Sequence, residues 1–397
     1  MTLARSPLMT ISGSAWSCFQ EPPTVTKAVP SARTSVRAKG EPVGAWDILT
    51  VKYLGDPLFT SQKGVDGPEW TLFAVGSAMP LVRLIAFAMT AVATRAVEAP
   101  AAPAPQSVWV VSVTEENDKF APKNKDRYYT QGLKVAINRG DHTFFSLTQE
   151  INTPSDTSSP NPSLDDMPYS GALYLGWGYG AILDRGGRRD CLFSVEAKLG
   201  VIGPSAGGET IQNKFHDLIG TPPAAGWGTQ VPDEFLINFD GEFRRRFDLD
   251  SSGRGYRDLI ARGVVELGTM RTEVLVGAQL RWGLNLDKSW GHSYIRHSNG
   301  YDPVDALRLP DARPDFAYWA FVDTQLEVVV RNYATDGTHF RESRGVTRSP
   351  VVLQCALGTT FQLRGCSATY FLAIRTKEFE TQADAHFFGG LKGQFLF

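Results

Sequence analysis

The chain has 397 residues, a formal net charge of -2 and an apolar fraction of 42%. That length suffices for one large β domain or two ordinary domains, and the near-neutral charge gives no reason to expect a nucleic-acid partner. The 38 Gly, 12 Tyr, 9 Trp and 23 Phe residues favour short strands joined by turns, and they also suit a membrane barrel with aromatic girdles. Outside the early part of the chain no apolar run reaches the length of about 18 residues that a transmembrane helix needs, which argues against a helical membrane protein.

The segment from Met79 has the pattern of a secretory signal peptide. It has a basic residue at Arg83, an apolar core of roughly 10 residues, and small residues around Ala96 and Ala99 that fit cleavage. We therefore predict a signal peptide and linker over 79–106, and Met79 as the true start. Residues 1–78 are rich in Pro, Ser and Thr without a sustained period, and are predicted to be a non-native or disordered extension. The alternative is a disordered leader followed by a short buried helix.

From about residue 107 the sequence alternates between apolar and polar residues. In the stretch 272–286, one face carries Val274, Val276, Ala278, Leu280, Trp282, Leu284 and Leu286, and the other carries Glu273, Gln279, Arg281 and Asn285. The C-terminal stretch behaves alike and ends on Phe397, which resembles the terminal aromatic residue of bacterial outer-membrane barrels.

Counting segments bounded by turn residues predicts about twelve strands. They lie near 108–116, 128–139, 143–152, 169–183, 190–202, 235–248, 256–268, 273–286, 315–332, 350–364, 366–377 and 386–397. An even number of antiparallel strands closes without an edge, as lipid requires. The predicted fold is therefore all-β, an antiparallel transmembrane β-barrel over 107–397 in the Gram-negative outer membrane, with a secreted β-sandwich as the alternative.

Long polar inserts separate some of these strands. They fall at about 153–168, 203–234, 287–314 and 333–349, and the rule that long loops of such barrels lie outside the cell predicts all four as extracellular. Within one of them, "GPSAGGETIQNKFHDLIG" (203–220) predicts a short helix with Glu209, Gln212 and His216 sharing a face.

Two groups of residues could carry chemistry, although each alone also has an ordinary structural explanation. His216 is the side chain best suited to accept a proton near neutral pH. Asn117 and Asp118 end the first strand with hard oxygen ligands that suit calcium, which could polarise an ester carbonyl.

The order of these motifs resembles the outer-membrane lipid A deacylase family, of the lipid A 3'-O-deacylase type. The resemblance covers residues 108–397 and rests on the pair Asn117–Asp118, "DRYYTQG" (126–132) and "GVIGPSAGGETIQNKFHDLIG" (200–220). It implies calcium-dependent hydrolysis of the ester that holds the 3'-linked acyloxyacyl group on lipid A, in the outer leaflet, and so remodelling of lipopolysaccharide. The expected partners are lipid A and outer-membrane lipid, and the protein is expected to be a monomer.

The resemblance also implies roles for individual residues. His216 would be the general base that activates water. Asn117 and Asp118 match the family's pair at the first strand, and Asp118 would bind the cation or orient the site. Thr130 and Gln212 would hydrogen-bond substrate or water. Three further residues are predicted to contact substrate: Tyr169, Lys214 and Glu209.

One feature departs from the family pattern. The insert at 153–168 has no Lys or Arg to meet an anionic head group. The basic residues that could replace that contact are Lys123, Lys125, Arg127 and Lys214.

Three alternatives remain open. Ser170 or Ser205 could be the nucleophile of a Ser-dependent lipase if either approaches His216. The enzyme could be an outer-membrane phospholipase-like esterase. The barrel could also be a non-catalytic small pore or scaffold, although Phe388 and Tyr128 on the inward face argue against a wide channel.

Overall fold

The computed structural model describes residues 108–121, 126–250, 256–286, 289–303 and 316–397, and two short strands nearer the N-terminus. Those two strands, β1 (Ile48–Thr50) and β2 (Thr71–Phe73), pair with each other in antiparallel orientation and belong to a separate unit of the chain. The predicted signal peptide, and Lys123 and Lys125, lie outside the described residues.

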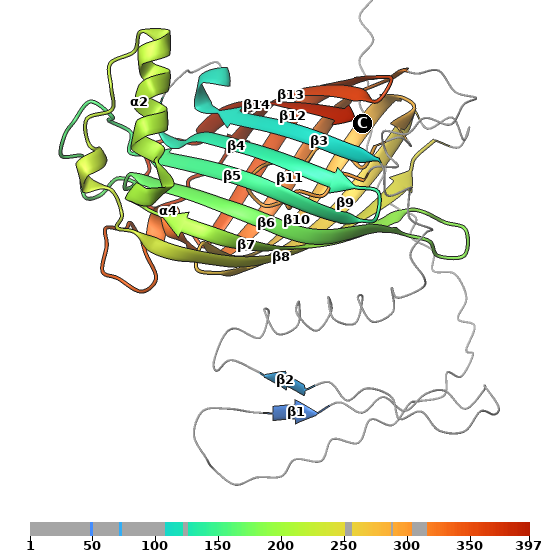
Figure 1. Ribbon diagram of the computed structural model, residues 1–397, viewed down its shortest axis with the longest axis horizontal. Coiled ribbons are helices and arrows are strands. Elements are labelled where there is room, and N and C mark those ends of the chain that lie inside the picture. Colours follow the sequence, from blue (N-terminus) through green and yellow to red (C-terminus); the bar gives the residue numbers. More distant parts are fainter. Residues whose placement is uncertain are drawn as a thin grey trace, which may run out of the picture. The chain divides into compact units, whose positions relative to one another are not determined.

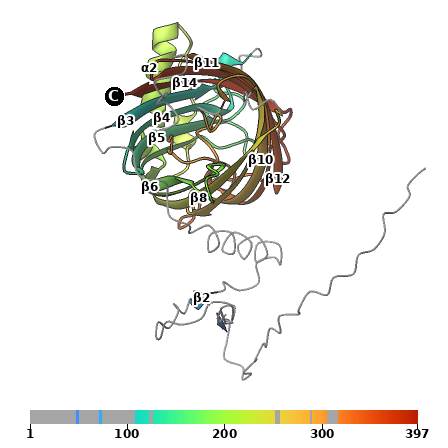
Figure 2. The same ribbon diagram turned by 90° about the vertical axis from the view of Figure 1, so that its right-hand side faces the viewer.

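Twelve strands form a closed barrel in which every neighbour is antiparallel, as predicted (Figures 1 and 2). The last strand pairs with the first, so the sheet has no free edge. The strands are β3 (Trp109–Asn117), β4 (Tyr128–Arg139), β5 (Thr143–Thr153), β6 (Ser170–Leu183), β7 (Cys191–Ile202), β8 (Glu234–Asp248), β9 (Arg257–Gly268), β10 (Arg271–Leu284), β11 (Phe316–Asn332), β12 (Val351–Leu363), β13 (Cys366–Arg375) and β14 (His386–Leu396).

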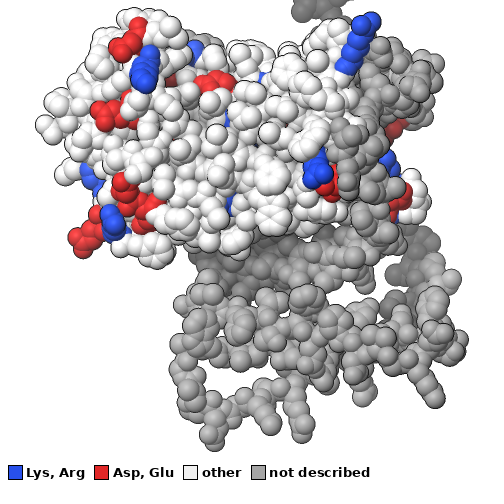
Figure 3. All heavy atoms as spheres, viewed as in Figure 1, with Lys and Arg blue, Asp and Glu red and all other residues white. Residues whose placement is uncertain are grey.

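The alternating pattern sorts side chains between the outer face and the lumen. Along β10, Val276 and Trp282 are exposed on the outside, while Glu273, Gln279 and Arg281 are buried within the barrel. On the face shown in Figure 3 the charged side chains gather mostly toward the two ends of the barrel, leaving a largely uncharged band between them. An apolar outer band with a polar interior is what a lipid bilayer requires. Among the described helices, none is long and apolar enough to cross a membrane.

Leu286 departs from the prediction. It was expected on the outer apolar face, but it is buried, because β10 ends at Leu284 and Asn285 turns the chain in the left-handed region at φ 57°.

The helices and most of the long connections gather at one end of the barrel. Helix α2 (Gly208–Ile219), helix α4 (Tyr333–Asp336) and the short helices η1 (Asp118–Phe120), η2 (Pro204–Ala206) and η3 (Trp227–Thr229) all follow strands that run toward this end. Figure 1 shows α2 standing at this end of the barrel. We call it the α2 end, and because long connections lie on the extracellular side of such barrels, it is the extracellular end.

The insert at 287–314 was predicted to be extracellular with the other three, and this was wrong. Strands alternate in direction around the barrel, so the connection from β10 to β11 lies at the end opposite α2. Residues 289–303, which we call the lumenal segment, fold back into the barrel and are almost all buried. Figure 2 shows coil within the ring of strands.

Polar contacts hold the lumenal segment along the interior wall. Lys134 Nζ donates to the carbonyl oxygens of Ile295 (3.2 Å) and Ser298 (3.1 Å), and Asn138 donates to that of Gly300 (3.0 Å). The described lumen is thus filled by a segment of the chain and by buried side chains. This argues against the pore alternative.

Candidate active site at the α2 end

Helix α2 presents one buried stripe to the rest of the barrel. Gly208, Gln212 and His216 are its buried residues, spaced four apart so that they lie on one face. Gly208 allows close packing, because a Cβ atom there would lie 2.7 Å from Cη2 of the buried Trp227. The helix ends at Gly220, whose left-handed conformation (φ 68°) returns its N–H to the last turn.

The stripe brings His216 and Gln212 to a carboxylate that lies two residues before the start of β4. His216 Nε2 lies 2.7 Å from Asp126 Oδ2, and Gln212 Nε2 donates to both oxygens of Asp126, at 3.2 and 3.3 Å. Gln212 Oε1 in turn accepts from Trp227 Nε1 at 2.8 Å. The amide is therefore held at both ends, and it fixes Asp126 beside the imidazole.

Asp126 had no predicted role, although it opens the "DRYYTQG" motif. The sequence did offer one signal for Asp126, namely an acidic residue just before a strand that begins at the α2 end. The sequence alone did not show that an insert from residues 203–220 would cover it.

Both nitrogens of His216 face oxygen acceptors. Nδ1 lies 2.7 Å from the carbonyl oxygen of Pro222, opposite the Nε2 contact with Asp126. A carbonyl and a carboxylate both accept hydrogen bonds, so either ring nitrogen can donate when it carries a proton.

Asp118 lies close to this group and has an oxygen to spare. Its Oδ2 accepts from the backbone N–H of Arg127 at 2.7 Å, whereas its Oδ1 is buried without a hydrogen-bond partner among the described residues. Burial raises the pKa of the Asp118 carboxyl well above its usual range, and the neighbouring Asp126 carboxylate raises it further. Two adjacent carboxylates with an unpartnered oxygen are chemically suited to a hard cation.

Two other predicted residues are engaged in local structure. Asn117 Oδ1 accepts from the N–H of Lys119 at 2.8 Å and caps helix η1. Thr130 lies at a bulge in the β4–β5 pairing, and its hydroxyl is 2.7 Å from that of Thr153.

The residues predicted to contact substrate lie in different environments. Lys214 and Glu209 are exposed on α2, with Glu209 outside the buried stripe. Tyr169 is fully buried, with its ring 4.8 Å from that of Trp227 and its hydroxyl donating to Thr157 O.

The candidate nucleophiles are bonded elsewhere. The Ser205 hydroxyl donates to Asp233 at 2.9 Å, and the buried Ser170 accepts from Asn152 at 3.2 Å. Within the described part of the chain neither hydroxyl is hydrogen-bonded to His216.

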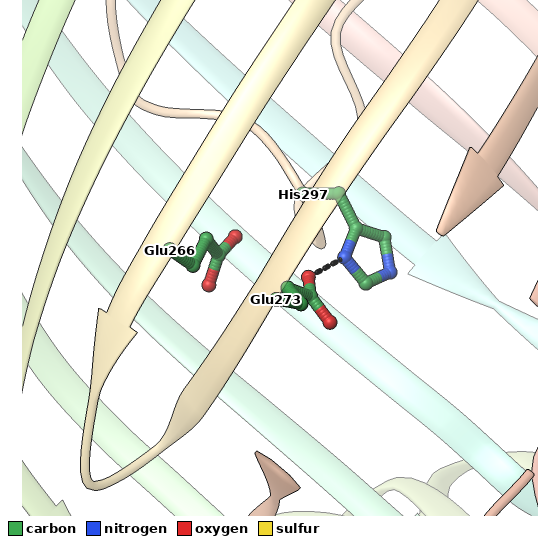
Figure 4. Close-up of side chains that lie close together, drawn as sticks. All are labelled: Glu266, Glu273 and His297. Atoms are coloured by element: carbon green, nitrogen blue, oxygen red, sulfur yellow. Dashed lines mark hydrogen bonds and ion pairs between the residues drawn. The ribbon is translucent and has the colours of Figure 1, made fainter. Parts of the chain in front are cut away.

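A second group of ionisable residues lies inside the barrel, where sequence reasoning proposed no site. Glu266, Glu273 and His297 offer donor atoms that lie within 4.8 Å of one another (Figure 4). A metal ion could be held by this buried group as well as near Asp118.

Comparison with known proteins identifies the relatives of the barrel. The family model described as Outer membrane protein LpxR matches residues 81–397. Among solved structures, LpxR from Salmonella typhimurium is similar at 19% identity with a TM-score of 0.60, over 72% of this chain and 100% of that chain. This likeness shows a shared fold.

Two other solved barrels show weaker likenesses. They are the β domain of the Bordetella autotransporter BrkA (10% identity, TM-score 0.35, covering 72% of this chain and 98% of that one) and the translocator domain of NalP from Neisseria meningitidis (11%, 0.30, 80% and 94%). No curated protein matches the chain.

Proposed function

The chain belongs to the LpxR outer-membrane protein family, a family of lipid A 3'-O-deacylases, and we propose that Asp126, His216 and Asp118 carry its reaction with the help of calcium. The protein is an ester hydrolase of the outer membrane that removes the 3'-linked acyloxyacyl group of lipid A. The observation that carries the assignment of residues is the 2.7 Å contact between His216 and Asp126, made beside the unpartnered oxygen of Asp118.

His216 serves as the base. Its Nδ1–H remains with the carbonyl of Pro222, so Nε2 is the atom that takes a proton from water. The water oxygen bonds to the acyl carbon, the bond from that carbon to the sugar oxygen breaks, and the sugar oxygen takes the proton back from Nε2. The products are a free acyloxyacyl acid and a sugar hydroxyl.

Asp126 stabilises the imidazole once it is charged. Its observed contact with Nε2 corresponds to the arrangement after proton transfer, in which a carboxylate faces an imidazolium. Before the transfer, Asp126 has to move away from Nε2 so that water can lie there. Gln212, which donates to both oxygens of Asp126, is the residue that positions it.

Asp118 is the residue best placed to hold calcium, with Asp126 beside it. The donor set fits, since Asp118 Oδ1 is buried and has no hydrogen-bond partner in the part of the chain that the structure describes, and the neighbouring carboxylate adds a second negative charge. When bound, calcium supplies a positive charge that polarises the ester carbonyl and stabilises the oxyanion.

The surroundings of α2 suit a lipid substrate. Beside the buried stripe of α2, Ile211, Phe215 and Leu218 are exposed, which is unfavourable in water and favourable beside acyl chains. The 153–168 loop lacks basic residues of its own, but Arg344 reaches it and donates to the carbonyl oxygen of Ser163 at 2.5 Å. Arg344 thus supplies a positive charge for the anionic head group.

Mass spectrometry of lipid A tests this function. Cells that express the chain should show lipid A lighter by the 3'-linked acyloxyacyl group, and cells that express His216→Ala should not, because the base is missing. The exposed His339 on another loop provides a matched control, and His339→Ala should retain the activity. Unchanged lipid A with release of fatty acid from phospholipids, by a folded chain in calcium, would instead identify a phospholipase.

Export provides a separate proposal. The mature protein should begin after the small residues near Ala99, with residues 1–78 absent. N-terminal sequencing of the protein from outer membranes checks this, and a mature chain that retains residues 1–78 would contradict it.

A further inference from the structure

A second cluster of metal-ligating side chains lies in the barrel interior. Glu266 comes from β9 and Glu273 from β10, on either side of the short β9–β10 turn, and His297 comes from the lumenal segment. One donor atom from each lies within 4.8 Å of the others, and Figure 4 shows the two carboxylates and the imidazole drawn together. The cluster therefore joins the wall of the barrel to the segment that fills it.

Two oxygens of this cluster have no hydrogen-bond partner among the described residues. Glu266 Oε1 and Glu273 Oε2 are both unpartnered, although the two residues are 0% and 2% exposed. A buried carboxylate oxygen without a donor costs free energy comparable to a lost hydrogen bond or more. Each of these oxygens is therefore available to coordinate a cation.

The basic side chains nearby are bound to other carboxylates. These ion pairs are Lys198 with Asp240, Arg271 with Glu150, and Arg375 with Glu327 (the last at 2.7 Å). Arg296 likewise pairs with Glu378 at 3.1 Å. Glu266 and Glu273 are thus left with no ion pair to Lys or Arg within the described residues, and a cation would balance their charge.

The backbone at His297 is also unusual. Its φ of 63° lies in the left-handed region, which a residue with a Cβ atom seldom adopts. The imidazole Nδ1 is hydrogen-bonded to Glu273. This side chain thus adds a contact with β10 to those that Lys134 and Asn138 make with the lumenal segment.

We propose that Glu266, Glu273 and His297 bind a divalent transition-metal ion of the zinc class, which fixes the lumenal segment to the barrel wall. Two carboxylate oxygens and one imidazole nitrogen suit zinc, whereas calcium prefers six to eight oxygen ligands. Three protein ligands leave a fourth position for water. On binding, the proton of His297 Nδ1 is released to solvent and the metal takes its place between the imidazole and Glu273.

Zinc titration of the full barrel chain in detergent tests the proposal. The protein is first stripped with a chelator and then kept in excess calcium chloride, which occupies oxygen sites. The His216→Ala background removes the other buried histidine that faces a carboxylate. In that background, zinc should bind at one equivalent and raise the unfolding temperature.

The variants decide between the lumenal site and adventitious binding. Glu266→Gln keeps the volume of the side chain and should weaken zinc binding at least about 10-fold, and His297→Ala should abolish it. His339→Ala, which removes an exposed histidine, should bind zinc as the parent does. Equal zinc binding by Glu266→Gln and the parent, or no zinc binding by a folded parent, would overturn the proposal.

Discussion

The barrel holds two histidines that can be compared, because each is buried and each lies beside a carboxylate. His216 lies on α2 and faces Asp126, close to an Asp118 oxygen that has no hydrogen-bond partner among the described residues. His297 lies within the lumen, between Glu273 and Arg375, in a network of ion pairs that crosses the barrel. We infer that the same residue types serve two purposes, and that access to lipid distinguishes the two sites. A helix at the barrel end can meet a lipid, while the lumenal segment is enclosed on all sides by strands.

The largest expected difference comes from removing each histidine in turn. His216→Ala should lower kcat about 10²- to 10⁴-fold with little change in unfolding temperature, since a general base is lost from the end of the barrel. His297→Ala should do the reverse, with reduced thermal stability and nearly normal kcat in the folded fraction. Deacylation kinetics and thermal unfolding on both variants measure this, and loss of kcat in folded His297→Ala protein would break the distinction.

Asp118→Asn should have the next largest effect. Activity should fall about 10²-fold or more, because a ligand for the charge that stabilises the oxyanion is lost, and calcium should no longer stimulate what remains. Assays with and without calcium check this. If calcium still fully stimulates the Asp118→Asn protein, the calcium site does not include Asp118.

Asp118 should also make the stability of the calcium-free protein depend on pH. Its pKa is raised in the folded state, so the folded state holds this proton more tightly than the unfolded state does. Its stabilising contribution is present below the unfolded pKa and is lost as pH rises through the raised folded pKa. Without calcium, Asp118→Asn should therefore be more stable than the parent at neutral pH, and calcium should narrow the gap. Denaturant unfolding across pH measures both effects.

The smallest expected effect concerns the head group. Arg344→Gln should raise KM for lipid A a few-fold and leave kcat nearly unchanged, since a partly exposed charge contributes about 1 kcal/mol or less. The effect should shrink on lipid A that lacks the phosphate. An equal change on both lipids would indicate that Arg344 only shapes the loop.

The sequence was sufficient for the parts of the fold that depend on period. The pattern predicts all twelve strands, with every boundary within two residues of the observed one, because a barrel strand between lipid and lumen alternates strictly. The spacing of Gln212 and His216 likewise predicted one face of α2.

What the sequence missed depends on which strands meet. Asp126 is 90 residues from His216 along the chain, and its role follows only once α2 brings His216 to the residues that precede β4. No periodic pattern in the sequence indicates that residues 289–303 fold into the barrel. Because successive connections alternate between the two barrel ends, the strand count alone would have placed this connection opposite α2. The cluster of Glu266, Glu273 and His297 comes from two strands and a loop, and no rule of sequence spacing predicts that these residues lie together.

The pairing of β14 with β3 has a consequence for how the molecule is made. Gln394 lies opposite Ser112, so the contact that closes the barrel joins residues near the two ends of the described barrel. Contacts between distant residues form slowly, because the intervening chain must first be ordered. Until β14 pairs with β3 and β13, each of these two strands has an unpaired edge. During that interval these edges can pair with strands of other chains. Deletion of β14 should therefore cause aggregation during assembly of the barrel.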